Sequence, residues 1–250
     1  MCRRPCGYRC GAAGKETNLK RLWNTDSCKD YHKALLNKYN QYKRDSYLVK
    51  YYPEAFGPSG TVYFIKTIVG FYDVTEKDWF ANDVKYVVDK KLMTGTGNDL
   101  FSLNGKTTRS QAVTILYRLA GSPKVSDDSS FTDVKSGTWY TDAVQWAVKN
   151  GITSGYGNGK FGPNDTLNRE QLATMLYRYA KFKKMNTTTI GGLSKFSDSG
   201  SISGYAIDAM SWAVSKGLIS GTSDGKLTPG STATRAQLAA ILHRFCENVK

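Results

Sequence analysis

The chain has 250 residues, of which 40% are hydrophobic and 12% aromatic, so it can bury a core and is not expected to be disordered over most of its length. Its formal net charge of +14 favours polyanionic partners such as nucleic acid, acidic lipid headgroups or anionic polysaccharide, without choosing among them. No segment approaches the ~20 apolar residues of a membrane helix, and no apolar segment typical of a signal peptide follows the N-terminal arginines.

Residues 1–60 form a predicted basic N-terminal extension that contains many tyrosines. Lys and Arg clearly outnumber Asp and Glu in this part of the chain. Lys29 to Tyr52 fits a basic amphipathic helix, and tyrosines interleaved with lysines leave a nucleic-acid-binding arm open as an alternative function. A poorly ordered linker or the end of an upstream module is the preferred interpretation. Four of the five cysteines lie here, at a spacing that does not match a zinc site, so we expect free thiols and no metal: Cys2, Cys6, Cys10 and Cys28.

Residues 61–250 contain three copies of one unit, at about 71–120, 131–180 and 196–246. Sliding the chain along itself until Phe71 meets Phe131 aligns the first copy with the second, and a slightly longer shift that brings Phe131 to Phe196 aligns the second with the third. This self-similarity predicts a repeat protein. The aligned positions include Phe71, Asp73, Trp79, Gly95, Arg109 and Gln111 of the first copy, and Phe131, Asp133, Trp139, Gly155, Arg169 and Gln171 of the second.

Each copy is predicted to contain two helices. The first spans about 79–91, 139–150 and 205–216, and a glycine that fits the C′ position follows it at Gly151 and Gly217. The second carries apolar residues at i, i+3, i+4 and i+7. One such hairpin cannot cover its own apolar stripe, whereas three can bury their stripes together. We therefore predict an all-α fold of three helical-hairpin repeats in a pseudo-threefold bundle.

The second helix of each copy begins with the same polar pattern. Thr or Asn occupies the N-cap and Gln stands three residues on, as in a capping box. The first helical position is Arg in all three copies, although a cation there opposes the helix dipole by roughly a few tenths of a kcal/mol. The three sets are Thr108, Arg109 and Gln111; Asn168, Arg169 and Gln171; and Thr234, Arg235 and Gln237.

Two interpretations of these arginines remain open from the residues alone. In the first, each guanidinium pairs with an acid, Asp73, Asp133 or Asp198, and locks neighbouring hairpins together. In the second, the guanidinium joins the free N–H groups at the helix start and binds a carboxylate or phosphate. Arginine suits both roles, so the two interpretations are about even.

Aromatic residues at the start of the first helix, Trp79, Trp139 and Tyr205, also have two interpretations. A ring at the edge of a groove can stack on the face of a sugar, but aromatic residues at helical spacing more often pack in the core. Trp146 and Trp212, deeper in the same helix, are interpreted as packing residues.

No catalytic motif is visible in the sequence. The chain has two histidines, His32 and His243, in different segments, and His243 aligns with Tyr117 and Tyr177 of the other copies. It is therefore interpreted as a replaced helix residue and not as a base. No nucleophile motif, phosphate-binding loop or set of metal ligands is found, so we expect neither an enzyme nor a cofactor.

The second copy resembles the repeat of a known family. Residues 131–178 read FTDVKSGTWYTDAVQWAVKNGITSGYGNGKFGPNDTLNREQLATMLYR, with F-x-D-V, W-Y-x-x-A-V, G-I-x-x-G, G-x-F-x-P and a helix start similar to T-R-A-E. This five-part pattern recurs in all three copies and so extends over most of the chain. It is similar to the S-layer homology (SLH) domain, which usually occurs in sets of three.

This resemblance implies a non-catalytic anchor with the form of a three-pronged α-helical spindle. Such triplets attach exported proteins to the bacterial cell envelope, mainly in Gram-positive organisms. They bind secondary cell-wall polysaccharides, often bearing ketal-linked pyruvate, in grooves between repeats. The Arg of the motif is the family's ligand-facing residue, and this role carries over to Arg109, Arg169 and Arg235. The resemblance therefore favours the anion-binding interpretation of these arginines.

Several departures from the family pattern concern the grooves. In all three copies of this chain, Gln stands where the family usually has Glu. This change preserves the cap but removes any Arg–Glu pair. Asn168 replaces Thr in the second copy, the first copy lacks the loop proline, and Tyr205 replaces Trp in the third. We therefore expect the groove that uses Arg169 and Trp139 to be the best formed.

Overall fold

The computed structural model of the chain describes residues 70–71, 73–97, 99–126 and 131–250. These residues belong to one compact unit, Thr67–Lys250. The predicted extension 1–60 lies outside the described residues, together with Cys2, Cys6, Cys10 and Cys28, the expected helix at 29–52 and the nucleic-acid alternative that depends on this segment. The predicted domain boundary near residue 60 lies outside them as well.

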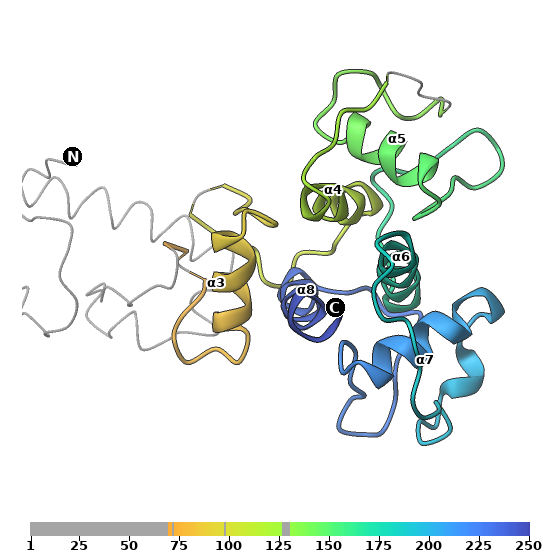
Figure 1. The fold of residues 1–250 in the computed structure, drawn as a ribbon. Coiled ribbons are helices and arrows are strands. Elements are labelled where there is room, and N and C mark those ends of the chain that lie inside the picture. Colours follow the sequence, from red (N-terminus) through yellow and green to blue (C-terminus); the bar gives the residue numbers. More distant parts are fainter. Residues whose placement is uncertain (1–69, 72, 98, 127–130) are drawn as a thin grey trace, which may run out of the picture. The chain divides into compact units, whose positions relative to one another are not determined.

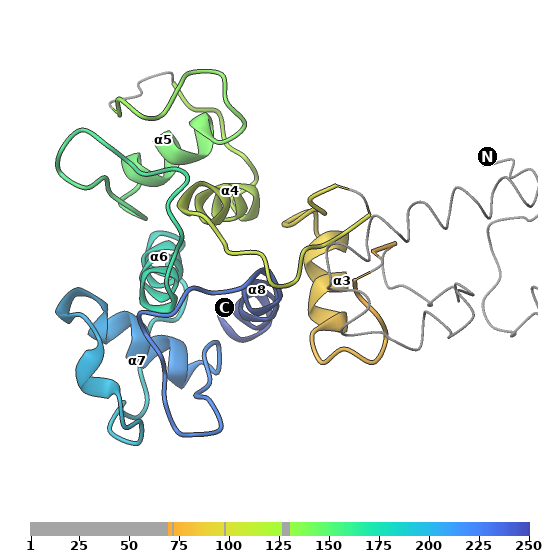
Figure 2. The ribbon, with the colours of Figure 1, turned by 180° about the vertical axis from the view of Figure 1, so that it is seen from behind.

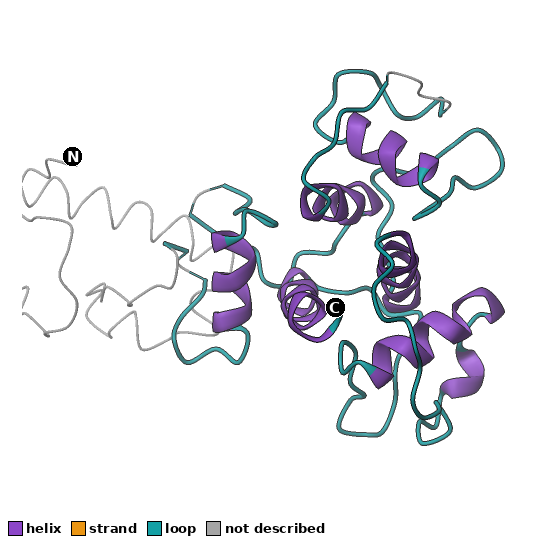
Figure 3. Cartoon of the chain, in the orientation of Figure 1, coloured by secondary structure: helices purple, strands orange, loops and turns teal. Residues whose placement is uncertain are grey.

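The described residues form an all-α fold, as predicted (Figure 3). The second helices of the copies begin at the predicted arginines, whereas the first helices begin about two residues later than predicted. Two short 3-10 turns, η3 (Ser199–Ser201) and η4 (Gly204–Ala206), precede the first helix of the third copy. The first helices are α3 (Ala81–Asp89), α5 (Thr141–Lys149) and α7 (Ile207–Ser215), and the second helices are α4 (Arg109–Leu119), α6 (Arg169–Phe182) and α8 (Arg235–Asn248).

The residue at C′ of the first helix, directly after the C-cap, takes a left-handed backbone conformation in all three copies. Gly151 and Gly217 have φ of 68°, as expected for glycines at C′. Lys91 occupies the same position in the first copy with φ of 57°. An L-residue pays roughly 1 kcal/mol for this conformation, so the first copy keeps the turn at a cost that the other copies avoid.

The helices form two layers around a central axis. Figure 1 shows α4, α6 and α8 around this axis with α5, α7 and α3 outside them, and Figure 2 shows the same arrangement from behind. The outer helix α5 packs on α4, α7 packs on α6 and α3 packs on α8. Each packed pair therefore joins the second helix of one copy to the first helix of the next. The pair α3 and α8 closes the ring between the first and last copies.

This pairing corrects one detail of the sequence prediction, which placed each hairpin within a single copy. Helical periodicity identifies the apolar face of a helix but not the helix that covers it. The hydrogen bond between His243 Nδ1 and Asp83 Oδ1, at 2.7 Å, and the stacked rings of His243 and Tyr86, 4.1 Å apart, lie at the closing contact of α8 with α3. His243 is thus a helix residue in the packing of two copies, consistent with its interpretation from the sequence.

The core lies between the central helices and between them and the outer helices. Trp146 and Trp212 are 5% and 0% exposed, which confirms that they are packing residues. A fully buried side chain of leucine size contributes about 1.5–3 kcal/mol relative to an exposed one. Leu119, the last apolar position predicted in the first copy, is only half-buried. The other apolar positions of the second helices are buried in all three copies: Ala112, Ile115 and Leu116; Leu172, Met175, Leu176 and Tyr179; and Leu238, Ile241, Leu242 and Phe245.

Three residues just before the second helices are joined in a ring of backbone hydrogen bonds. Thr107 N donates to Ala233 O at 3.3 Å, Ala233 N donates to Leu167 O at 3.3 Å, and Leu167 N donates to Thr107 O at 2.8 Å. Each copy therefore donates to one neighbour and accepts from the other. The side chain of Thr107 is fully buried in this ring, and its Oγ1 has no hydrogen-bond partner within the part of the chain that the structure describes.

Candidate ligand grooves between the repeats

The capping boxes predicted at the second helices are all present. Thr108 Oγ1 accepts a hydrogen bond from Gln111 N at 3.3 Å, and Gln111 Oε1 accepts one from Thr108 N at 3.1 Å. The same reciprocal pair of bonds joins Asn168 with Gln171, and Thr234 with Gln237. Replacement of Glu by Gln has therefore left the cap complete, because the amide oxygen accepts as a carboxylate would.

The first two N–H groups of each second helix donate to a loop of the following copy. Arg109 N donates to Asp165 O at 3.0 Å and Ser110 N donates to Pro163 O at 3.1 Å. The expectation of free N–H groups at these helix starts was therefore wrong, since the neighbouring copy already satisfies them. The equivalent bonds are Arg169 N to Ser231 O and Glu170 N to Pro229 O in the second helix start, and Arg235 N to Gly105 O and Ala236 N to Leu103 O in the third.

The three guanidinium groups reach into the same loops. Arg109, Arg169 and Arg235 are 6%, 9% and 7% exposed. In each, Nε and Nη2 donate to two backbone carbonyl oxygens of the following copy, so each arginine fastens two copies together. The acceptors are Phe161 O at 2.9 Å and Ser154 O at 2.8 Å for Arg109, Leu227 O at 2.9 Å and Ser220 O at 3.0 Å for Arg169, and Phe101 O at 2.8 Å and Thr94 O at 2.6 Å for Arg235.

The aspartates suggested as partners of these arginines hold the loops instead. Asp73 Oδ1 accepts from Phe101 N at 2.7 Å, and the equivalent loop N–H groups donate to Asp133 and Asp198. Hydrogen bonds from Leu227 N and Thr228 N hold the pKa of Asp198 below its ordinary value. The arginines thus lock neighbouring copies, as the first interpretation predicted, but through backbone carbonyls that the aspartates position.

One nitrogen of each guanidinium is not used in these contacts between copies. Nη1 of Arg109, Arg169 and Arg235 makes no hydrogen bond to the described residues. Among the described residues, the side-chain polar atom that is both fully buried and without a hydrogen-bond partner is Thr107 Oγ1. The three Nη1 atoms have no such partner either, so they are not fully buried and reach solvent. Burial lowers the pKa of all three guanidinium groups, yet arginine stays charged because its ordinary pKa is above 12.

The aromatic residues at the starts of the first helices are exposed. Trp79, Trp139 and Tyr205 are 66%, 62% and 56% exposed, so they are not core residues. The ring of Trp139 meets the ring of Tyr140 edge to face, with centroids 5.0 Å apart, and Trp79 meets Phe80 in the same way at 5.2 Å. Each tryptophan thus packs against the aromatic ring of the next residue and has a large apolar surface in contact with solvent.

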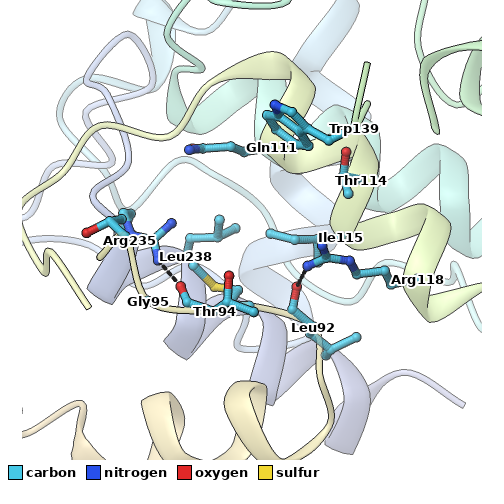
Figure 4. Close-up of a pocket in the computed structure, with 12 residues that line it drawn as sticks. Leu92, Thr94, Gly95, Gln111, Thr114, Ile115, Arg118, Trp139, Arg235 and Leu238 are labelled. Atoms are coloured by element: carbon cyan, nitrogen blue, oxygen red, sulfur yellow. Dashed lines mark hydrogen bonds between the residues drawn. The ribbon is translucent and has the colours of Figure 1, made fainter. Parts of the chain in front are cut away.

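A cavity of about 330 Å³ combines an arginine with one of these aromatic residues (Figure 4). Its walls come from all three copies. Arg235 and Leu238 belong to α8, and Trp139 to the second copy. The first copy supplies Leu92, Met93, Thr94, Gly95 and Thr96 from its loop, and Gln111, Thr114, Ile115 and Arg118 from α4.

The structure therefore groups Trp139 with Arg235, whereas the sequence led us to expect a groove of Arg169 and Trp139. The repeats are wound around the axis, so an aromatic residue and the arginine beside it belong to different copies. Among the aromatic residues at the outer helix starts, the one whose charge interaction acts on the pKa of Arg109 is Tyr205 of the third copy. Pairing residues within one copy was the error.

Arg118 is a cavity residue that sequence reasoning missed. Its Nη1 donates to Leu92 O at 3.0 Å. Figure 4 shows that Arg118 and Arg235 thus bind carbonyls of the same loop, Arg118 at Leu92 and Arg235 at Thr94. Arg178 and Arg244 occupy the same position in the other two copies. This recurrence of a cation was visible in the aligned repeats and is the signal that would have found it.

The described residues contain no group of three or more His, Cys, Asp or Glu side chains placed to hold a metal ion. Among the helices described, none has the length and apolar character needed to cross a bilayer. The candidate site is thus a surface groove with two cations, an exposed indole and several hydroxyl and amide groups, which together can bind an anionic polar ligand.

Comparison with known proteins identifies the repeats. The family described as the S-layer homology domain matches residues 70–113, 130–173 and 195–239. The chain is 33% identical over 172 residues to an endoglucanase from Bacillus sp. (strain KSM-635), 32% identical over 169 residues to the surface-layer 125 kDa protein of Lysinibacillus sphaericus, and 30% identical over 181 residues to an S-layer protein of Bacillus thuringiensis subsp. finitimus. These matches cover 69%, 66% and 69% of this chain but only 18%, 14% and 21% of the respective relatives.

Proposed function

The chain belongs to the S-layer homology domain family, whose domains are non-catalytic modules for anchoring at the bacterial cell surface, and on this premise we propose a ligand and a site. The module attaches its protein to the envelope of a Gram-positive bacterium by binding an anionic, pyruvylated secondary cell-wall polysaccharide. The polysaccharide lies in the grooves between repeats. The catalytic names of some relatives are not carried over, because this chain spans a small part of their length.

The cavity of Arg235 and Trp139 carries this proposal. A pyruvyl carboxylate accepts a hydrogen bond from Arg235 Nη1, which has no hydrogen-bond partner among the described residues, and Arg118 supplies a second positive charge. The 62% exposed ring of Trp139 offers an apolar surface to a sugar ring. Gln111 and the hydroxyl groups of the cavity provide partners for sugar hydroxyls.

The arrangement suits a rigid binding site. Two carbonyl oxygens hold the guanidinium of Arg235 in place before any ligand arrives, so little side-chain freedom is lost on binding. A hydrogen bond that involves a charged group contributes about 1.5–3 kcal/mol. Several grooves on one module that engage one polymer would add avidity to such modest contacts.

A pull-down of the full chain with purified cell-wall sacculi tests the proposal. Sacculi that retain the pyruvylated polysaccharide should retain the protein, whereas sacculi treated to remove the polysaccharide or its pyruvate should not. Trp139→Ala should weaken retention, and Ile190→Ala, at an 80% exposed apolar residue away from the cavity, is the matched control. Equal retention by treated and untreated sacculi would refute the proposed ligand.

A further inference from the structure

The three arginine sites differ at three equivalent positions of the loop that receives the guanidinium. Around Arg109 these positions hold Tyr156, Gly162 and Asp165. The backbone shows that the positions are equivalent, because Tyr156 N donates to Lys160 O just as Thr96 N donates to Leu100 O and Thr222 N to Lys226 O. The corresponding residues are Thr96, Ser102 and Gly105 around Arg235, and Thr222, Thr228 and Ser231 around Arg169.

Tyr156 covers the guanidinium of Arg109. Arg109 Cζ lies 4.8 Å from the ring centroid of Tyr156 and 4.7 Å from that of Phe161. Arg235 has one such neighbour among the described residues, Phe101 at 4.7 Å, since a threonine stands where the second ring would be. A ring against the guanidinium satisfies part of its charge and occupies space that a ligand needs.

Asp165 places a carboxylate beside the same arginine. Tyr156 Oη donates to Asp165 Oδ2 at 2.9 Å, which ties the ring and the carboxylate together. Burial lowers the pKa of Arg109, and Tyr156 and Asp165 are the main groups that raise it again. The site of Arg109 therefore already contains a negative charge, whereas Gly105 and Ser231 bring none to the other two sites.

The absence of a side chain at Gly162 leaves room for Tyr156 and Asp165. Gly162 has φ of 72°, and a Cβ there would overlap both Asp165 Oδ2 and Tyr156 Cε2. The other copies keep the same left-handed conformation with side chains, at Ser102 with φ of 60° and Thr228 with φ of 49°. A side chain is tolerated at this position in the two copies that lack the pair, and it is absent in the copy that has the pair.

A second carboxylate acts on the aromatic residue near Arg109. Glu170 is 6% exposed and accepts hydrogen bonds from Ser203 N at 3.0 Å, Ser203 Oγ at 2.8 Å and Tyr205 Oη at 3.3 Å. The equivalent residues, Ser110 and Ala236, are uncharged. An anion approaching Arg109 past Tyr205 thus meets a negative charge that the other sites do not have.

We propose that Tyr156 and Asp165 form a plug that closes the Arg109 groove to anionic ligands, so that the three grooves of the module are not equivalent. The Arg235 groove is open, and the Arg169 groove lacks both plug residues. This inference rests on the proposed function, because it concerns the same class of ligand. It assigns to Tyr156 and Asp165, in the loop of the second copy, a role in fastening that copy to Arg109 rather than in binding the ligand.

The test measures binding to the full chain of a methyl hexoside that carries a 4,6-linked pyruvyl ketal, with the same hexoside lacking pyruvate as control. Trp139 lies in the Arg235 groove, and the same winding of the copies assigns Trp79 to the Arg169 groove. Trp79→Ala with Trp139→Ala therefore removes the exposed aromatic surface from the two grooves without a plug and should weaken binding at least 10-fold. Adding Tyr156→Thr and Asp165→Ser, which are the residues of the third copy, should restore binding at least 10-fold. A further Tyr205→Ala should abolish the restored binding.

The outcomes separate the inference from the proposed function. No binding of the pyruvylated hexoside to the unchanged chain would refute the proposed function. Binding to the unchanged chain without recovery in the plug variant would refute the plug alone. Thr96→Tyr combined with Ser102→Gly, in an otherwise unchanged chain, provides a second test, because a ring against Arg235 should weaken binding there several-fold, and Ser102→Gly makes room for that ring as Gly162 does for Tyr156. Unchanged binding by this double variant, with Ser102→Gly alone as its control, would also contradict the plug, and thermal unfolding of every variant checks that the fold is retained.

Discussion

The central helices α4, α6 and α8 begin with complete capping boxes and with arginines that are 6% to 9% exposed, whereas the outer helices α3, α5 and α7 begin without a side-chain cap hydrogen bond. Near the outer starts lie aromatic rings that are 56% to 66% exposed. The central starts are held by neighbouring copies through backbone bonds, and the outer starts present apolar surface to solvent. A groove that combines both has a rigid cation on one side and a free ring on the other.

The largest difference in stability between the central and outer helix starts is expected when Arg169 and Trp139 are each replaced by alanine. Arg169→Ala leaves the carbonyls of Leu227 and Ser220 without their donor and should lower the free energy of unfolding by about 3 kcal/mol. Trp139→Ala removes an exposed side chain and should change it by less than about 0.5 kcal/mol. Urea unfolding of the full chain measures both.

Equal losses of stability in these two variants would contradict the division of roles. The comparison also bears on binding experiments. An arginine variant changes the fold and the ligand contact together, whereas a tryptophan variant changes the contact alone. Loss of binding in Trp139→Ala with an unchanged unfolding free energy is therefore the cleaner evidence for a groove.

Loss of a cap of a central helix is expected to have the next largest effect on stability. Asn168→Ala removes the acceptor for Gln171 N and should destabilise the protein by about 1 kcal/mol. Asn168→Thr, which installs the cap of the other two copies, should stay within about 0.5 kcal/mol of the unchanged chain. A chemical unfolding curve for each variant tests this, and an equal loss in both would show that the cap bond is not the cause.

Removal of the buried Thr107 hydroxyl, which has no hydrogen-bond partner among the described residues, should raise stability by about as much as loss of a cap lowers it. Thr107→Val replaces the buried Oγ1 with a methyl group of nearly the same size, and the free energy of unfolding should rise by about 1 kcal/mol. Thr107→Ser keeps the hydroxyl and loses a methyl group, so it should not stabilise. A lower unfolding midpoint for Thr107→Val would mean that the hydroxyl has a favourable partner in solution.

The smallest effect concerns the ends of the outer helices. Lys91→Gly removes the left-handed strain at C′ of α3, partly offset by the greater freedom of glycine in the unfolded chain, for a net gain of about 0.5 kcal/mol. Gly151→Ala, at the equivalent position after α5, should instead lose about 1 kcal/mol. Unfolding midpoints that move in the same direction for both would contradict this explanation.

Most of the central layer could be predicted from the sequence. The tripled Arg and Gln, the caps and the apolar spacing identify where α4, α6 and α8 begin and which faces they bury. These features are local, because a capping box joins residues three apart and periodicity is a property of one helix. The same reasoning identified Gly151 and Gly217 as C′ residues.

The contacts between copies were not predictable in the same way. The arginines bond to backbone carbonyls, and a carbonyl oxygen leaves no signature in the sequence, so an acid such as Asp133 was the natural but mistaken partner. The pairing of Trp139 with Arg235, and the packing of α3 on α8, depend on how the copies wind around the axis. That winding is a property of the assembled ring and not of any one repeat.

The most direct test of the central claim is a titration of the full chain with the pyruvylated hexoside, followed by the NMR signals of the Trp139 indole N–H and the Arg235 Nε–H. We predict that both signals shift along one saturating binding curve, and that the hexoside without pyruvate leaves the Arg235 signal in place. A bound pyruvylated hexoside that moves neither signal would show that the anionic group lies elsewhere, and would contradict the account.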